Sequence, residues 1–243
     1  MPLLRAQDCD RYAYSDASKY VIYPYKNVKN NTELIDLKEF ELKYPNTADY
    51  LRRNKSLLVK RKDSRKEMGG TSGWHSLVRF GRIDIFNKPK IVTPGEVKRN
   101  KFGLDITGSA YSGARVFGIT SENDKLDLKI LLGILNSKLV EFYLHSVASL
   151  KQGGYYSYSS TVIDAIPLPH KVINTKDKDI VSLRNLVDTI LSDNYKIQSI
   201  KSDTEKSLLQ DKIKFLESEI DCLVYNLYDI SASEIQMIEK TIQ

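Results

Sequence analysis

The sequence contains little cysteine and no long hydrophobic run. Its two cysteines, Cys9 and Cys222, lie near opposite ends of the 243 residues, so we expect no disulfide framework. Cys222 lies within an apolar helical pattern, which predicts a buried thiol. Because disulfides persist in oxidising compartments, this usage indicates a reducing, cytoplasmic setting. No run of 18 apolar residues occurs, and residues 1–9 lack the apolar stretch of a secretory signal, so we expect no membrane span.

Positive charge is concentrated in one part of the chain. The net charge is +6, but residues 43–101 alone carry 16 basic and 5 acidic residues, while the other segments are weakly acidic. Such clustering is typical of a protein that binds a polyanion such as nucleic acid. The alternative is a solvated, lysine-rich surface. The hydrophobic fraction of 41% allows a packed core of one large domain or two small ones.

The first half of the chain has the pattern of strands, turns and short helices. Residues 20–23 are β-branched and aromatic, which predicts a strand that Pro24 ends. Thr47 is positioned to cap a helix that runs to Leu58. Further strands are expected at residues 90–93, 102–106 and 114–120. The glycine-bearing connection at 108–113 predicts that the last two of these strands form a hairpin.

The second half has helical periodicity. Apolar residues repeat every three or four positions from Leu128 to Phe142, which predicts one amphipathic helix. Residues 183–197 and 209–230 continue with heptad spacing, which predicts an antiparallel helical pair. Ser231 and Glu234 have the spacing of a capping box for a last short helix. We therefore expect an α+β fold, with a mixed β-sheet lobe at residues 1–170 and a helical subdomain at 171–243.

Several local patterns together resemble the TaqI-like C-terminal specificity domain of type IIG restriction–modification enzymes and related adenine-N6 DNA methyltransferases. The resemblance extends along nearly the whole chain, and its strongest parts are the Leu135-Asn136-Ser137-Lys138-Leu139 helix and the Ile166-Pro167-Leu168-Pro169 turn. The other matching stretches are residues 21–25, 50–55, 88–91, 101–105, 153–156 and 220–228.

This resemblance implies a domain that reads a DNA target beside a methyltransferase domain. The chain has no adjacent proline pair, so it lacks the Asn/Asp-Pro-Pro-aromatic motif that holds a flipped base. It also has no early glycine-rich turn after an apolar strand for S-adenosylmethionine. We therefore expect no catalytic centre in this chain, with S-adenosylmethionine and Mg²⁺ bound only by partner domains.

Candidate DNA contacts divide by the chemistry of the side chain. Lysine and arginine clusters neutralise phosphates, and the arginine fork matches the two guanine acceptors in the major groove. For each residue the alternative is a solvated charge or core packing. The candidates for phosphates are Lys60, Arg61, Lys62, Arg65 and Lys66. The candidates for base edges are Arg79, Arg82, Arg99, Lys101 and Arg115. Aromatic contacts are expected from Trp74, His75 and Tyr155.

Asp84, Glu96 and Lys98 have the residue types of a metal-dependent nuclease. Two carboxylates can hold Mg²⁺ while a lysine assists the attacking water. The alternative is that Glu96 and Lys98 lie in an ordinary turn after Pro94-Gly95. The three histidines have no partner at a metal-ligand spacing.

The favoured interpretation is a sequence-specific, double-stranded DNA recognition module of a restriction–modification system. It would direct an adenine-N6 methyltransferase, and an endonuclease where one is present, to a short target. Its expected partners are duplex DNA, a methyltransferase domain or subunit and a possible nuclease domain. The competing hypotheses are the Mg²⁺-dependent nuclease and a protein-interaction scaffold built on the C-terminal helices.

Overall fold

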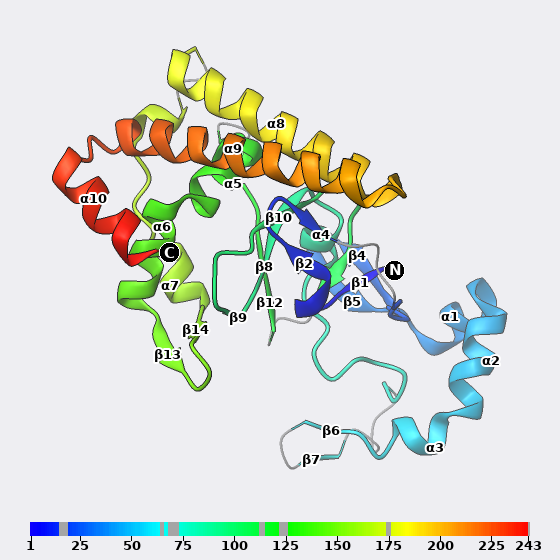
Figure 1. Ribbon diagram of the computed structural model, residues 1–243. Coiled ribbons are helices and arrows are strands. Elements are labelled where there is room, and N and C mark those ends of the chain that lie inside the picture. The colour runs from blue at the N-terminus through cyan, green and yellow to red at the C-terminus, as the bar shows by residue number, and fades with distance from the viewer. Residues whose placement is uncertain are drawn as a thin grey trace. The chain divides into compact units, whose positions relative to one another are not determined.

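The structure, a computed structural model, describes residues 1–14, 19–63, 66–67, 73–111, 115–121, 126–173 and 176–242. The chain divides into two compact units. Unit 1 comprises Met1–Leu3, Ser18–Lys88 and Gly108–Ala110. Unit 2 comprises Leu4–Ala17, Pro89–Thr107 and Tyr111–Gln243. Both units combine helices with small antiparallel sheets (Figure 1), so the predicted α+β class is confirmed.

Unit 1 is built from a hairpin and short helices around a small core. Lys29 and Asn30 connect the hairpin strands and both have positive φ, as a two-residue type I′ turn requires. Phe40 and Trp74 are buried in the core. The elements are β4 (Tyr25–Val28), β5 (Asn31–Leu34), α1 (Leu37–Lys43), α2 (Pro45–Arg53), α3 (Lys55–Leu58), β6 (Lys62–Asp63), β7 (Lys66–Glu67) and α4 (Ile83–Phe86).

Two predictions about unit 1 are wrong. Residues 21–24 form no strand; Tyr20 makes an isolated bridge with Pro2, and the strand β4 begins only at Tyr25. The helix expected from Thr47 begins at Pro45, because proline at the first helical position needs no backbone N–H partner. It also ends at Arg53, and a separate turn, α3, follows.

The sheet at the centre of unit 2 has the strand order β10-β8-β12, with both pairings antiparallel. The predicted hairpin between residues 102–106 and 114–120 is therefore wrong, because the buried strand β8 lies between them. Lys90 faces Asp105 across the β8–β10 pairing, and their charged groups are 2.7 Å apart with both side chains fully buried. A buried charge pair leaves an unpaired charge if the strands slip, so it favours this register.

Short strands and 3-10 turns surround this sheet. The order in the second three-stranded sheet is β13-β14-β9, and β2 pairs with β3 and β1 with β11. The bounds are β1 (Leu3–Leu4), η1 (Ala6–Asp8), β2 (Cys9–Asp10), β3 (Ala13–Tyr14), β8 (Lys90–Pro94), β9 (Glu96–Val97), β10 (Gly103–Asp105), β11 (Ala110–Tyr111), β12 (Val116–Ile119), β13 (Ser149–Lys151), β14 (Tyr155–Ser157) and η2 (His170–Ile173).

The apolar pattern from Leu128 to Phe142 forms two helices instead of the single helix expected. The first ends at Asn136, and the Ser137 hydroxyl accepts the Val140 N–H and so caps the second. A serine in this position provides a hydrogen bond that competes with continued helix. The helices are α5 (Leu128–Asn136), α6 (Lys138–Val147) and α7 (Ser160–Asp164).

No single helix within the described ranges has the length and apolar character of a membrane span. Helices α5 and α6, bent by 67°, meet that criterion as a pair by length and composition only.

The C-terminal helices α8 (Lys178–Ser199) and α9 (Asp203–Leu227) lie side by side in opposite directions (Figure 1). The predicted antiparallel pair is confirmed, as is the capping box of Ser231 and Glu234 that begins α10 (Ala232–Thr241). Cys222 is exposed, so its predicted burial is wrong. These helices belong to unit 2 because α8 packs on α5. Separate roles for residues 1–170 and 171–243 stay a prediction.

Gly133 sets how closely α5 and α8 approach. A Cβ atom there would lie 2.9 Å from both Leu183 Cδ1 and Val187 Cγ2, and both side chains are fully buried. Gly133→Ala should lower the free energy of unfolding by about 1–2 kcal/mol, because overpacking outweighs the helix propensity gained. Urea unfolding would measure this, with Ser182→Ala on the exposed face of α8 as the control. A more stable Gly133→Ala protein would contradict this view of the contact.

Candidate nucleic-acid interface

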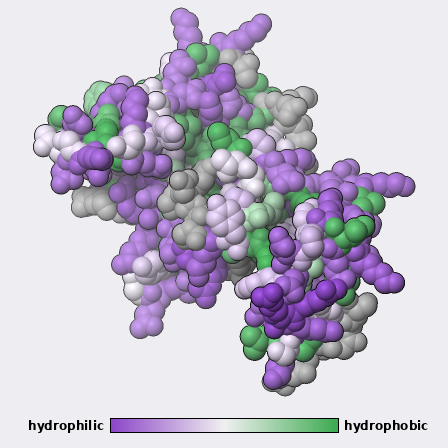
Figure 2. Space-filling view, turned by 90° about the vertical axis from the view of Figure 1, so that its right-hand side faces the viewer, coloured by the Kyte–Doolittle hydropathy of each residue, from purple (hydrophilic) through white to green (hydrophobic). Residues whose placement is uncertain are grey.

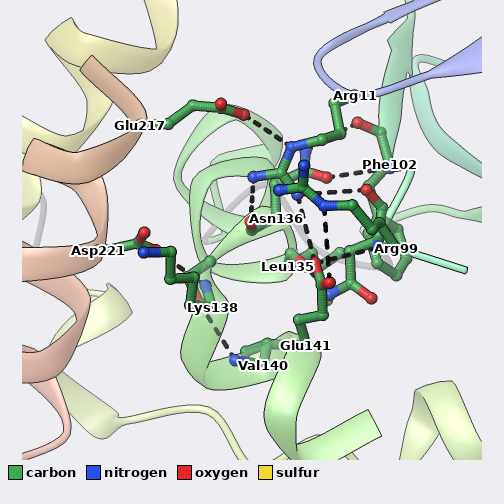
Figure 3. Close-up of polar contacts among 12 residues, drawn as sticks. Arg11, Arg99, Phe102, Leu135, Asn136, Lys138, Val140, Glu141, Glu217 and Asp221 are labelled. Carbon is green, nitrogen blue, oxygen red and sulfur yellow. Dashed lines mark hydrogen bonds and ion pairs between the residues drawn. The ribbon is translucent and has the colours of Figure 1, made fainter. Parts of the chain in front are cut away.

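A buried polar cluster holds the chain before β10 against the junction of α5 and α6 (Figure 3). The Asn136 side chain is fully buried and bonds both backbone groups of one residue. Its Oδ1 accepts the Phe102 N–H at 3.1 Å, and its Nδ2 donates to the Phe102 carbonyl at 2.8 Å. The Asn136 carboxamide thus bonds the N–H and the carbonyl of Phe102 in the way that a neighbouring strand would.

Asn100 makes the matching contacts from the other side. Its Nδ2 donates to the Leu135 carbonyl at 2.7 Å, its backbone N–H donates to Glu141 Oε2 at 3.2 Å, and its Oδ1 accepts the Tyr158 hydroxyl. Because Asn100 is fixed inward, the basic residues on either side of it are held at the surface.

Arg11, from the turn between β2 and β3, joins this cluster to α9. Its guanidinium donates to the Asn136 carbonyl at 2.7 Å, to the Asn100 carbonyl at 3.2 Å and to Glu217 Oε1 at 2.7 Å (Figure 3). These residues lie far apart in the sequence, so composition and periodicity did not reveal the cluster. The Asn136-Ser137 stretch was noted only as part of the family resemblance.

Arg99 and Lys101 lie at the surface of unit 2. Their side chains are 61% and 45% exposed, which leaves room for a phosphate. Arg99 Nε is 3.8 Å from Glu141 Oε1, and Lys101 Nζ is 3.4 Å from Asp10 Oδ1. The Lys101–Asp10 pair is exposed on both sides and contributes little, so a phosphate can replace it, whereas Arg99 lies beside the buried Glu141. Both residues stay candidates for DNA contact.

Arg115 and Tyr155 line the same pocket of unit 2. Arg115 is exposed, and the Tyr155 side chain is 40% exposed. Lys98 places its Nζ 5.1 Å from the centre of the Tyr155 ring, a cation–π contact that the sequence did not predict. Tyr158, which also lines the pocket, is 2% exposed and packs in the core.

The basic run of unit 1 contains residues with different roles. Lys60 and Lys62 are exposed. Arg61 is partly buried and donates to the carbonyls of Leu58, Trp74 and Ser76 at 2.8–2.9 Å, so it joins α3 to a later part of the chain. Of the other two phosphate candidates, Arg65 lies outside the described residues, and only the backbone of Lys66 is described.

Trp74 and His75 pack inside unit 1. They are 6% and 5% exposed, and His75 Nε2 is 2.9 Å from the Ile35 carbonyl oxygen. Lys55 Nζ lies 5.2 Å from the Trp74 ring centre. This burial favours a structural role for both residues over the DNA contact expected from their position beyond a glycine loop.

Arg79 and Arg82 are exposed residues of unit 1. Arg82 forms a two-pronged ion pair with Asp84, with hydrogen bonds of 3.2 and 2.6 Å. This arginine lowers the pKa of Asp84 by its hydrogen bonds. A base contact by Arg82 would have to replace this pair.

The nuclease hypothesis gains no support from these contacts. Asp84 is held by Arg82, and it belongs to unit 1 while Glu96 and Lys98 belong to unit 2. Across the described ranges no group of three or more His, Cys, Asp or Glu side chains is placed to hold a metal ion.

Hydrophilic side chains cover most of the face shown in Figure 2, with hydrophobic residues scattered among them. Exposure alone therefore does not show which charged residues contact DNA. The assignment of a function rests on the similarity of this chain to known proteins. The pattern of the TaqI-like C-terminal specificity domain matches residues 1–168.

This chain belongs to the TaqI-like C-terminal specificity domain family.

Two curated relatives agree with this family. The chain is 26% identical to the type II restriction enzyme and methyltransferase RM.Eco57I of Escherichia coli, over 97% of this chain and 25% of that protein. It is 21% identical to the type II methyltransferase M.BstVI of Geobacillus stearothermophilus, over 100% of this chain and 36% of that protein. The chain thus spans about a quarter to a third of the length of these relatives.

The resemblance predicted from the sequence is confirmed by this match. All the residues predicted to contact DNA lie within the matched region of the TaqI-like domain, whereas α8, α9 and α10 follow it. The role of each individual residue stays a prediction.

Asn136 is the side chain on which the polar cluster depends most. Asn136→Ala leaves the Phe102 N–H without a partner and removes one of the two hydrogen bonds to the Phe102 carbonyl, which keeps the Tyr12 N–H. We therefore expect the free energy of unfolding to fall by roughly 2–5 kcal/mol. Chemical denaturation would measure it. The control is Asn185→Ala on the exposed face of α8, expected to change stability by less than about 1 kcal/mol. Equal effects of the two substitutions would contradict the importance of the cluster.

Asp221 should make stability depend on pH. Burial raises its pKa from 3.8 to about 6, although its Oδ1 accepts the Lys138 N–H at 2.8 Å. Because the folded state binds this proton more tightly than the unfolded state, stability should fall as pH rises from about 4 to about 6. Asp221→Asn should remove this decline and stabilise the protein at pH 7 by roughly 1–3 kcal/mol.

The control for this titration is Asp211→Asn, an exposed position on the same helix. It should leave the decline between pH 4 and pH 6 unchanged in thermal unfolding. A decline that persists in Asp221→Asn would show that another group causes it.

Proposed function

We propose that this chain is the sequence-specific, double-stranded DNA recognition module of a restriction–modification system. The observation that carries this proposal is the family match over residues 1–168. Relatives named as a restriction enzyme and methyltransferases align along nearly all of this chain. A specificity domain must bind phosphates for affinity and base edges for sequence.

The exposed basic residues support binding to a polyanion in both units. Lys60 and Lys62 lie in unit 1, and Arg99, Lys101 and Arg115 lie in unit 2. We infer that unit 1 contributes phosphate contacts and that unit 2 contributes both phosphate and base contacts.

The partner in this proposal is an adenine-N6 methyltransferase domain, joined in the same polypeptide or as a subunit. The relatives are about three to four times as long as the matched region, and both carry methyltransferase in their names. A nuclease domain is a further proposal, supported by the name of the Escherichia coli relative alone. The large hydrophobic side chains exposed on α8 and α9, such as Tyr195 and Phe215, favour a contact of these helices with such a partner. The proposed site of action is the cytoplasm.

Neutralising Lys60 and Lys62 together should weaken DNA binding equally on all sequences. We expect the Lys60→Gln, Lys62→Gln protein to lose roughly 5- to 10-fold in affinity for duplex DNA, because two phosphate contacts are lost. The slope of log K against log salt should decrease by up to about 2. Fluorescence anisotropy at several salt concentrations would measure both quantities.

Arg61 is left unchanged in this test, because its three bonds to carbonyls make it part of the fold. The matched control is Lys178→Gln, Lys201→Gln, two exposed lysines outside the family match. If the control weakens binding as much as the test variant, the surface at Lys60 and Lys62 is not the phosphate contact. If the unaltered chain binds no duplex DNA at low salt, the proposed function is wrong.

A further inference from the structure

The pocket beside β9 contains two opposite charges that have no partner among the residues that the structure describes. Its volume is about 390 Å³, and Arg115 and Glu96 both line it together with the aromatic rings of Phe117 and Tyr155. Within the described ranges neither charged side chain forms a hydrogen bond or an ion pair, with the other or with a third residue. Both residues are exposed, so a ligand can reach them.

Backbone hydrogen bonds join the three separate segments that carry these side chains. Strand β14 pairs with β9, with Ser157 opposite Glu96. The Gly95 N–H donates to the Arg115 carbonyl at 2.8 Å, and the Gly95 carbonyl accepts the Tyr158 N–H at 2.8 Å. A Cβ at Gly95 would lie 3.2 Å from the Phe117 ring, a tight contact that glycine avoids. These contacts fix the backbone positions from which Glu96 and Arg115 extend.

A ligand that matches both charges has two hydrogen-bond acceptors for Arg115 next to a hydrogen-bond donor for Glu96. A guanidinium fork matches O6 and N7 of guanine, and a carboxylate accepts from N4 of cytosine. A G·C pair shows these groups side by side in the major groove, whereas an A·T pair would present the thymine O4 acceptor to the carboxylate. We propose that Arg115 and Glu96 together read one G·C pair of the DNA target, a role that rests on the proposed function above.

The neighbouring hairpin has the shape that the major groove admits. Strands β13 and β14 run side by side and are joined by a tight turn (Figure 1). Gly153 and Gly154 have φ of 80° and 77° in this turn. A two-stranded ribbon fits the major groove, and β14 is shared by the hairpin and the pocket. Leu150 is 65% exposed on the hairpin and can contact a base or sugar.

The test begins by selecting bound sequences from a pool of randomised duplexes with the full chain. Affinities for the selected site and for its single-pair variants then give the discrimination at each position. The unaltered chain should prefer G·C at one position by roughly 10- to 100-fold. Arg115→Ala and Glu96→Ala should each abolish most of that preference and leave the other positions unchanged.

A second variant tests for a gain of specificity, which a merely structural role would not produce. Glutamine pairs with adenine N6 and N7, and removal of the carboxylate admits thymine. Arg115→Gln with Glu96→Ala should therefore change the preferred pair at that position from G·C to A·T.

The matched controls are Arg184→Ala and Glu219→Ala, exposed charges on α8 and α9, which should select the original site. The proposal is overturned if Arg115→Ala and Glu96→Ala keep the G·C preference. It is also overturned if Arg115→Ala weakens binding equally on every sequence, which would make Arg115 a phosphate contact. If the unaltered chain selects no sequence at all, the proposed function fails and this inference fails with it.

Discussion

The pairing of the Asn136 carboxamide with the backbone of Phe102 is the interaction on which the rest of unit 2 depends. The pairing holds the segment before β10 against the end of α5. The backbone carbonyl of Asn136 also accepts a hydrogen bond from Arg11. A buried polar network is stable only when every member is satisfied. This one is continuous from the β2–β3 turn to α9, and the exposed Arg99 and Lys101 lie on either side of its member Asn100.

The parts of the structure that the sequence predicted correctly are those determined by local pattern. The heptad spacing of α8 and α9 requires only neighbouring turns of one helix and a partner close in the chain. The capping box of Ser231 and Glu234 lies within four residues. The family was also found, because the short motifs that carry the resemblance occur in order along the chain, most of them within the matched residues 1–168.

The errors arose where a distant residue decided the outcome. Strand β8 pairs with β10 on one edge and with β12 on the other, and it is buried. The glycine-bearing connection at residues 108–113 does not reveal that a third strand separates the two. The basic run at residues 60–62 looked uniform, yet Arg61 is bound to carbonyls up to fifteen residues away. Trp74 and His75 are buried in unit 1, so the DNA contact expected of them stays a prediction. The candidates for base contacts also stay predictions, because the partner that would decide their role lies outside this chain.

Gly95 joins the backbone at Arg115 to the backbone at Tyr158 through hydrogen bonds of main-chain atoms alone. Because these bonds do not involve the side chains of Glu96 and Arg115, exchanging those two side chains costs little folding free energy. A change of target would then require few substitutions and no rebuilding of the domain. On the role proposed for this pocket, selection can alter recognition and stability independently.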